Sequence, residues 1–189
     1  MKWNRRNGHL LASSHAEEVL VWDERVSTLH TSELNIILSG PVHQKGTIPI
    51  VAFKAHDATI YGIDWSRHSE YELSTCSLDK SVKFWDTRTT DRDEHGPGAR
   101  PLNTMQTDYP VWRAKYLPFG RGVLTQPYRE SAKLEMYRTD KVDEPVHTFE
   151  GFDGVVKEYV WRLKGGESDT YGMQMITPLL VATEILFSR

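Results

Sequence analysis

Three residues in the middle of the sequence carry the side chains of a nucleophilic triad. They are a histidine, a hydroxyl residue and an aspartate, namely His56, Thr75 and Asp79. If they met in the fold, the imidazole could take a proton from the hydroxyl while the carboxylate orients the ring. The segment around Thr75, "LSTCS", lacks the glycine-flanked elbow that exposes such a nucleophile. The sequence therefore disfavours an enzyme, and we expect no catalytic residue.

Metal and phosphate chemistry are not indicated by the sequence either. His43, His56 and His68 lack the spacing of zinc ligands, and Cys76 is the single cysteine. Neither common type of glycine-rich phosphate loop is present. The single cysteine also excludes an internal disulfide and suits a reducing compartment. We expect neither a metal nor a cofactor.

Charge and composition narrow the class of protein further. The 189 residues include 23 basic and 26 acidic ones, for a net charge of −3, which gives no reason to expect nucleic acid or anionic lipid as a partner. No apolar run approaches the ~20 residues of a membrane span. The opening "MKWNRRNGHLLASSH" lacks the apolar stretch of a secretory signal. Twenty aromatic residues favour strands, and the 13 Gly and nine Pro favour turns.

Short alternating segments must position the polar residues. "TIYGIDWS" and "SVKFWD" alternate with a period of two, which indicates strands, and "YELSTCS" is a short strand before a turn at Asp79. The segment "SVKFWDTR" ends on Trp85-Asp86, and "EVLVWDER" ends on Trp22-Asp23, so the two tryptophans are 63 residues apart. This recurrence predicts a repeated unit of three strands joined by short turns.

Two further copies of the unit are weaker. "VWRAKYLPFG", "GVLTQPY" and "KLEMYRTD" form a third unit, in which Tyr116 and Tyr137 stand where the other units have tryptophan. A fourth begins at "EGFDGVVKEYVWR". Four-stranded repeats with Trp-Asp at the end of the third strand are typical of a β-propeller. We therefore predict an all-β fold, a partial WD40 β-propeller of about three blades plus the start of a fourth, arranged as an open arc.

The repeats set the expected domain boundaries. The partial propeller is predicted over 1–164, with units at about 1–51, 52–103 and 104–150 and the start of a fourth at 151–164. After Trp161 the sequence shows no second strand, no Asp turn and no third strand with a tryptophan. We therefore expect 165–189 to be a divergent tail. A frame-shifted or intron-derived segment would explain such a tail, and a natural short form is the alternative.

Two segments interrupt the repeats. Residues 26–51 are longer than a fourth strand and its turn require, which predicts an inserted surface loop around an outer strand. Residues 89–101, "TTDRDEHGPGARP", are polar and rich in Gly and Pro, which predicts a flexible loop.

The Trp-Asp endings resemble those of WD-repeat proteins. In that family a histidine pairs with a strand Ser or Thr, a turn Asp and the Trp, so the resemblance assigns a structural tetrad of His56, Thr75, Asp79 and Trp85. The imidazole would bridge the carboxylate and the hydroxyl, and the hydroxyl would accept from the indole N–H. Buried polar groups that satisfy one another in this way do not destabilise the fold.

The tetrad is expected to be incomplete in other units. Counted back from Trp22, the first unit has Ala16 at the Asp79 position and Ala12 at the Thr75 position. The fourth unit has Phe152 in place of the histidine. We expect those blades to rely on packing instead.

Several strings resemble one family within the WD-repeat proteins. They are "MKWNRRNGHLLASSH", "SVKFWDTR", "YPVWRAKYLPFGRGVLT" and "EPVHTFEGFDGVVKEYVWR". They are similar to the WD-repeat subunit of the SEA complex of fungi and the GATOR complex of animals, of the Mtc-five and WD-repeat-fifty-nine type. The resemblance implies a non-catalytic scaffold in amino-acid-responsive TOR signalling. It also implies other complex subunits as partners, and a cytoplasmic location at the vacuolar or lysosomal membrane without insertion into it.

A second function from another class stays open on the repeat ends. Receptors of cullin-based ubiquitin ligases use Trp-Asp-x-Arg, which occurs here twice, with its key residues at Trp22, Asp23, Arg25, Trp85, Asp86 and Arg88. The arginine could meet a ligase adaptor. It could equally pair with its own aspartate at the surface of a propeller.

Overall fold

The computed structural model describes residues 1–25, 49–88, 91–93, 96–98, 101–129, 133–152, 154–163 and 178–184. Within these ranges all regular structure is β-strand. Most of the expected loop at 26–51 therefore lies outside the described residues.

Three four-stranded antiparallel sheets form the body of the molecule. The first sheet contains β1 (Lys2–Trp3), β2 (Leu10–His15), β3 (Glu18–Asp23) and β4 (Val51–Lys54). The second contains β5 (Ile60–Trp65), β6 (Glu72–Ser77), β7 (Ser81–Asp86) and β10 (Pro101–Gln106). The third contains β11 (Val111–Tyr116), β12 (Gly122–Pro127), β13 (Leu134–Arg138) and β14 (His147–Phe149). Each sheet pairs its strands in chain order, as a propeller blade does.

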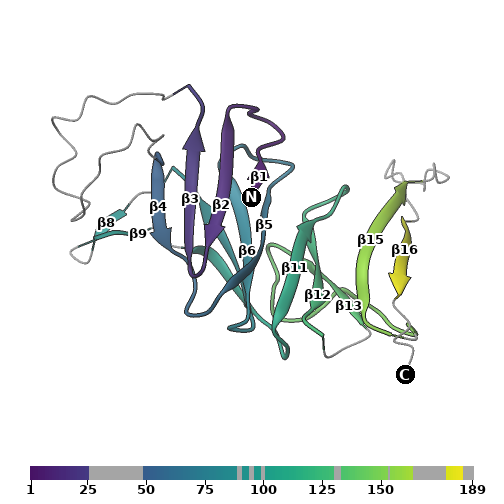
Figure 1. The fold of residues 1–189 in the computed structure, drawn as a ribbon. Helices are drawn as coiled ribbons and strands as arrows, with labels where there is room; N and C mark the ends of the chain where they lie inside the picture. The colour runs from purple at the N-terminus through teal and green to yellow at the C-terminus, as the bar shows by residue number, and fades with distance from the viewer. Residues whose placement is uncertain are drawn as a thin grey trace, which may run out of the picture.

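A fourth sheet has two strands, β15 (Val156–Leu163) and β16 (Pro178–Glu184). Figure 1 shows the sheets in succession from the purple N-terminal sheet through the teal and green sheets to the β15–β16 pair, and the arc does not close. The first strands of neighbouring sheets meet, since β5 contacts both β1 and β11. The fold is therefore all-β, and its sheets form an open partial propeller.

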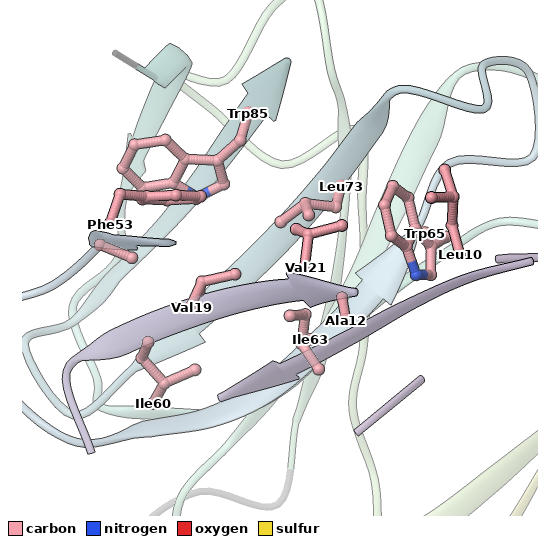
Figure 2. Packing of buried hydrophobic residues seen from close by; sticks show 11 residues of the cluster. Leu10, Ala12, Val19, Val21, Phe53, Ile60, Ile63, Trp65, Leu73 and Trp85 are labelled. Atoms are coloured by element: carbon pink, nitrogen blue, oxygen red, sulfur yellow. The ribbon is translucent and has the colours of Figure 1, made fainter. Parts of the chain in front are cut away.

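The largest core cluster lies between the first and second sheets, as Figure 2 shows. Val19 and Val21 of β3 are buried against residues of the second sheet that include Ile63 and Leu73. Trp65 at the end of β5 is also fully buried. Burial of each such side chain contributes roughly 1.5–3 kcal/mol, so contact between sheets holds the blades together.

Hydrogen bonds also cross from sheet to sheet. The Trp65 indole N–H donates to the Lys2 carbonyl over 3.0 Å, which joins the second sheet to the first. The Tyr116 backbone N–H donates to Asp64 Oδ2 over 3.0 Å, which joins the third to the second. The Tyr159 hydroxyl donates to the Leu124 carbonyl over 3.2 Å, which joins the fourth to the third. Each blade is thus fixed in register with the one before it.

The structure corrects the sequence analysis at the chain's end. We expected no second strand beyond Trp161, yet Pro178–Glu184 form β16 and pair antiparallel with β15. The run Leu179, Leu180 and Val181 supplies apolar and β-branched residues that suit a strand, although it lacks the turn and tryptophan that mark the other units.

The two interrupting segments differ in part from expectation. The outer strand expected within 26–51 is β4, which begins only at Val51 and continues to Lys54. Residues 89–101, expected to be a loop, include β8 (Asp91–Asp93) and β9 (Gly96–Gly98), which pair antiparallel. Residues 89–90, 94–95 and 99–100 lie outside the described part of the chain.

Candidate functional site

The structure brings together the four residues assigned as a tetrad in the second sheet. His56 lies between β4 and β5, Thr75 in β6, Asp79 in the β6–β7 turn and Trp85 in β7. His56 Nδ1 lies 2.8 Å from Asp79 Oδ2, and His56 Nε2 lies 2.7 Å from Thr75 Oγ1. The Trp85 indole N–H donates to the same Thr75 oxygen over 2.8 Å. One chain of hydrogen bonds thus links the segment before β5 to the two middle strands.

The proton positions follow from burial. Burial lowers the pKa of His56, and the nearby Asp79 carboxylate offsets this only in part. A neutral imidazole with its proton on Nδ1 donates to Asp79, and Nε2 then accepts the Thr75 hydroxyl proton. The hydroxyl oxygen remains free to accept from Trp85. Every polar group of this hydrogen-bond network is therefore satisfied while the imidazole ring is uncharged.

The turn holds the Asp79 carboxylate from its other side. Burial alone would raise its pKa, but the Ser81 hydroxyl and His56 outweigh that effect, and the pKa of Asp79 is lowered. Ser81 Oγ donates to Asp79 Oδ1 over 2.6 Å, and the Ser81 backbone N–H donates to the same oxygen over 3.0 Å. Asp79 is therefore a charged acceptor with fixed donors.

This geometry does not suit nucleophilic catalysis. Thr75 is fully buried, at 0% exposure, and its hydroxyl is already shared between His56 and Trp85. A nucleophile must reach a reacting atom about 3 Å away, and no substrate can approach this one.

The first sheet contains a related network that the sequence analysis misassigned. Trp22 pairs with Leu11 across β2 and β3, just as Trp85 pairs with Leu73 across β6 and β7. The residue two positions past Leu11 is Ser13, and the Trp22 indole N–H donates to its hydroxyl over 2.9 Å. Ser13, not Ala12, therefore holds the position of Thr75.

A shorter turn explains this error. The first hairpin is one residue shorter than the second, because Ser13 precedes Trp22 by nine residues while Thr75 precedes Trp85 by ten. A count of ten residues back from Trp22 therefore gives Ala12, the residue just before Ser13. The imidazole also has a different source, since His15 Nε2 lies 3.1 Å from Ser13 Oγ.

The third sheet contains a network that sequence reasoning did not find. The Tyr109 hydroxyl lies 2.8 Å from Thr125 Oγ1 and donates to Glu135 Oε2 over 2.6 Å. The Tyr137 hydroxyl donates to the same carboxylate over 2.7 Å, and Lys133 Nζ lies 2.6 Å from Glu135 Oε1. Burial alone would raise the pKa of Glu135, but its three donors, led by Lys133, lower it.

This network replaces the tetrad with other residue types. Tyr137 pairs with Val123, and Thr125 lies two positions further on, at the place of Thr75. Tyr109 takes the part of His56 by reaching the threonine hydroxyl. Thr125 lies two residues past the partner of Tyr137, a relation that the strand register reveals. In the fourth unit, Phe152 packs against the core cluster between the third and fourth sheets.

The two Trp-Asp-x-Arg motifs have the same geometry. Arg25 Nη2 lies 2.6 Å from Asp23 Oδ2, and Arg88 Nη2 lies 2.6 Å from Asp86 Oδ2. Hydrogen bonds from Arg25 lower the pKa of Asp23 to about 2. The arginine side chains remain 57% and 61% exposed. Each arginine thus pairs with its own aspartate at the surface.

The described part of the chain contains neither a metal-binding cluster nor a membrane-spanning helix. Its described residues include no group of three or more His, Cys, Asp or Glu side chains placed to hold a metal ion. They also include no helix with the length and hydropathy to cross a membrane.

One protein family matches a single repeat of the chain, and several individual proteins are similar to nearly the whole chain. The WD domain, G-beta repeat family matches residues 47–86, which include the four residues of the second sheet's network. GATOR2 complex protein WDR59 of Homo sapiens is 35% identical over 181 residues, 94% of this chain and 16% of that protein. An RWD, RING finger and WD repeat-containing protein of Schizosaccharomyces pombe is 34% identical over 94% of this chain and 12% of its own length.

Maintenance of telomere capping protein 5 of Saccharomyces cerevisiae is 28% identical over 94% of this chain and 14% of its own length. The chain thus spans only 12–16% of the length of these three relatives. The similarity covers the propeller strands and says nothing of the rest of the relatives.

Proposed function

Because the chain is a WD40-repeat protein related over nearly its whole length to GATOR2 complex protein WDR59 and Maintenance of telomere capping protein 5, we propose that it is a non-catalytic scaffold subunit of a SEA/GATOR-like complex. The relation over 94% of the chain is the observation that carries the proposal. Its place is amino-acid-responsive TOR signalling. It lies in the cytoplasm and reaches the vacuolar or lysosomal membrane through the complex, without entering the bilayer.

The hydrogen-bond networks support a structural role for the tetrad. His56, Thr75, Asp79 and Trp85 satisfy one another inside the second sheet, and the third sheet reaches the same end with tyrosines and a glutamate. Different residues at equivalent places serve to anchor a blade, whereas a catalytic site would need the same nucleophile and base. We therefore expect no hydrolase or transferase activity in any preparation.

Affinity purification of the tagged protein from its own cells tests the proposal. Mass spectrometry should recover the other subunits of a SEA/GATOR-like complex in stoichiometric amounts. Recovery of a cullin adaptor without those subunits would instead establish the ligase-receptor function.

An arginine variant separates these two functions further. The exposed Arg88 favours the receptor function, but its bidentate pairing with Asp86 leaves fewer donors for an adaptor. Arg88→Ala should leave the SEA/GATOR-like subunits in the purified complex. Loss of a cullin adaptor in that variant would mark the receptor function as the correct one.

A further inference from the structure

An aromatic cluster lies where the first strands of the second and third sheets begin. Tyr61 of β5, Trp112 of β11 and Tyr128 beyond β12 contact one another, with ring centroids 4.7–5.4 Å apart. Tyr61 is 38% exposed, and the other two rings are half-buried. The Arg129 guanidinium lies over the Tyr128 ring, 4.9 Å from its centroid. The rings of Tyr61 and Tyr128 are stacked, and the Trp112 ring is tilted against both.

A hollow of about 280 Å³ adjoins this cluster. Tyr61 lines it, together with residues of the first strands of all four sheets. Among its described lining residues the charged side chains are three cations and one carboxylate, Lys2, Arg113, Lys115 and Glu158. The hollow therefore has an excess of positive charge although the chain as a whole is acidic.

The single carboxylate shows how strongly this hollow favours negative charge. Hydrogen bonds from Lys115 and Arg113 lower the pKa of Glu158 to about 2. Lys115 Nζ lies 2.8 Å from Glu158 Oε1, and Arg113 bonds the other oxygen. An ammonium has three donors and a guanidinium five, so both cations keep donors for a second carboxylate.

We propose that this surface binds an acidic peptide segment of a partner protein, with its carboxylates in the cationic hollow and an aromatic side chain on the Tyr61–Trp112–Tyr128 cluster. The charge of the hollow selects carboxylates, and the partly exposed aromatic rings offer an apolar surface of the kind that anchors binding partners. The hollow is the size of one or two side chains. The inference rests on the proposed scaffold function and names where and how one partner is held.

Fluorescence polarisation with a defined probe tests the surface. The chain, fused to a solubility carrier, is titrated against a short fluorescein-labelled peptide of alternating Asp and Phe. Binding should weaken with added salt, and a peptide with Asn in place of Asp should bind about tenfold more weakly. Equal binding of the Asn peptide, or displacement by a short oligothymidylate at the same concentration as by unlabelled peptide, would overturn the proposal.

Matched variants locate the binding. Tyr128→Ala should weaken the acidic peptide about tenfold, while Tyr71→Ala, which removes a half-buried tyrosine that lies under Arg88, should not. Lys2→Glu should weaken it severalfold, and Lys141→Glu, which makes the same charge change on the loop after β13, should not. Thermal melts check that each variant is folded. If a folded variant and its control weaken peptide binding equally, the proposed site is contradicted.

The affinity purification distinguishes this inference from the function on which it rests. If the complex subunits co-purify but the acidic peptide does not bind, the docking surface is contradicted and the proposed function is not. If the acidic peptide binds at this surface but no complex subunit co-purifies, the docking surface is supported and the SEA/GATOR-like function is contradicted.

Discussion

At the scale of single residues, the histidine network of the second sheet holds a buried imidazole in its neutral form. The ring is 1% exposed and spends both nitrogens on neighbours, Asp79 on one side and Thr75 on the other. Removal of one neighbour takes a hydrogen-bond partner from a buried group, which costs more than the bond itself contributes. The network therefore makes the blade sensitive to single substitutions.

Asp79→Ala should lower the free energy of unfolding by roughly 1–3 kcal/mol, because buried His56 loses its carboxylate acceptor and keeps only the Ser81 hydroxyl, 3.1 Å from Nδ1. Thermal melts of the chain fused to a carrier without tryptophan, followed by tryptophan fluorescence, would measure this. Asp57→Ala is a suitable control because its side chain is largely exposed. An unchanged melt for Asp79→Ala would remove the structural role of the tetrad.

The buried histidine should also make stability depend on pH. Because burial lowers the pKa of folded His56, the unfolded chain binds the proton first as the pH falls through about 6.5. The stabilisation is therefore complete above that pH and is lost progressively as the pH falls toward the folded pKa. Denaturant unfolding at about pH 7.5 and pH 5.5 should show this loss, and His56→Gln should reduce it. An equal loss in both proteins would assign the pH dependence to other groups.

At the scale of elements, the packing of β5 against its neighbour β6 depends on glycine at one position of β5. A Cβ at Gly62 would lie 2.5 Å from Cys76 Sγ and 3.4 Å from the Cα of Arg113. Gly62→Ala should therefore destabilise the chain by roughly 1–3 kcal/mol through overpacking. The double variant Gly62→Ala/Cys76→Ala should recover part of that loss in the same melts. Strictly additive effects would show that the sulfur is not the obstacle.

The tyrosine network gives the third sheet its own polar anchor. Tyr109→Phe removes a donor to Glu135 and a partner of Thr125, both buried, and should cost about 1–3 kcal/mol. Tyr71→Phe removes only the hydroxyl of a half-buried tyrosine and keeps its ring beneath Arg88, so it should change stability by less than about 0.5 kcal/mol. Melting temperatures of the two variants decide the matter. Similar shifts would mean that the Tyr109 hydroxyl does not anchor the sheet.

The strands and the hydrogen-bond networks differ in how well the sequence alone predicts them. Period-two alternation predicted β5 and β7, because successive side chains of a strand point to opposite faces and the pattern lies within the segment itself. The place of Ser13 depends on the length of a turn, which a count from Trp22 does not register. The Tyr109 network uses residue types that carry no known spacing, so only the register of Tyr137 with Val123 reveals it. The strand β16 was missed because it lacks the turn and the tryptophan that mark the other repeats.

At the scale of the whole molecule, the arc leaves two sheets with one neighbour each. The first sheet packs on the second, and the β15–β16 sheet packs on the third, but Figure 1 shows no contact that returns from the last sheet to the first. A closed propeller has four to eight blades, and each blade covers the faces of its neighbours. Among the residues that the structure describes, no further blade covers the outer side of either terminal sheet.

The open arc leads to a prediction for residues 1–189 expressed alone, without a carrier. Uncapped repeat arrays are poorly soluble, and unpaired strand edges such as those of the two-stranded fourth sheet favour association. The chain should therefore be aggregated, unstable or bound to chaperone, and should become soluble when a partner or carrier covers its terminal sheets. Size-exclusion chromatography and thermal melts of the isolated chain measure this directly. A monodisperse monomer with one sharp, cooperative melt would mean that the terminal sheets meet or are covered in solution. The open arrangement of β1–β4 and β15–β16 would then have to be abandoned.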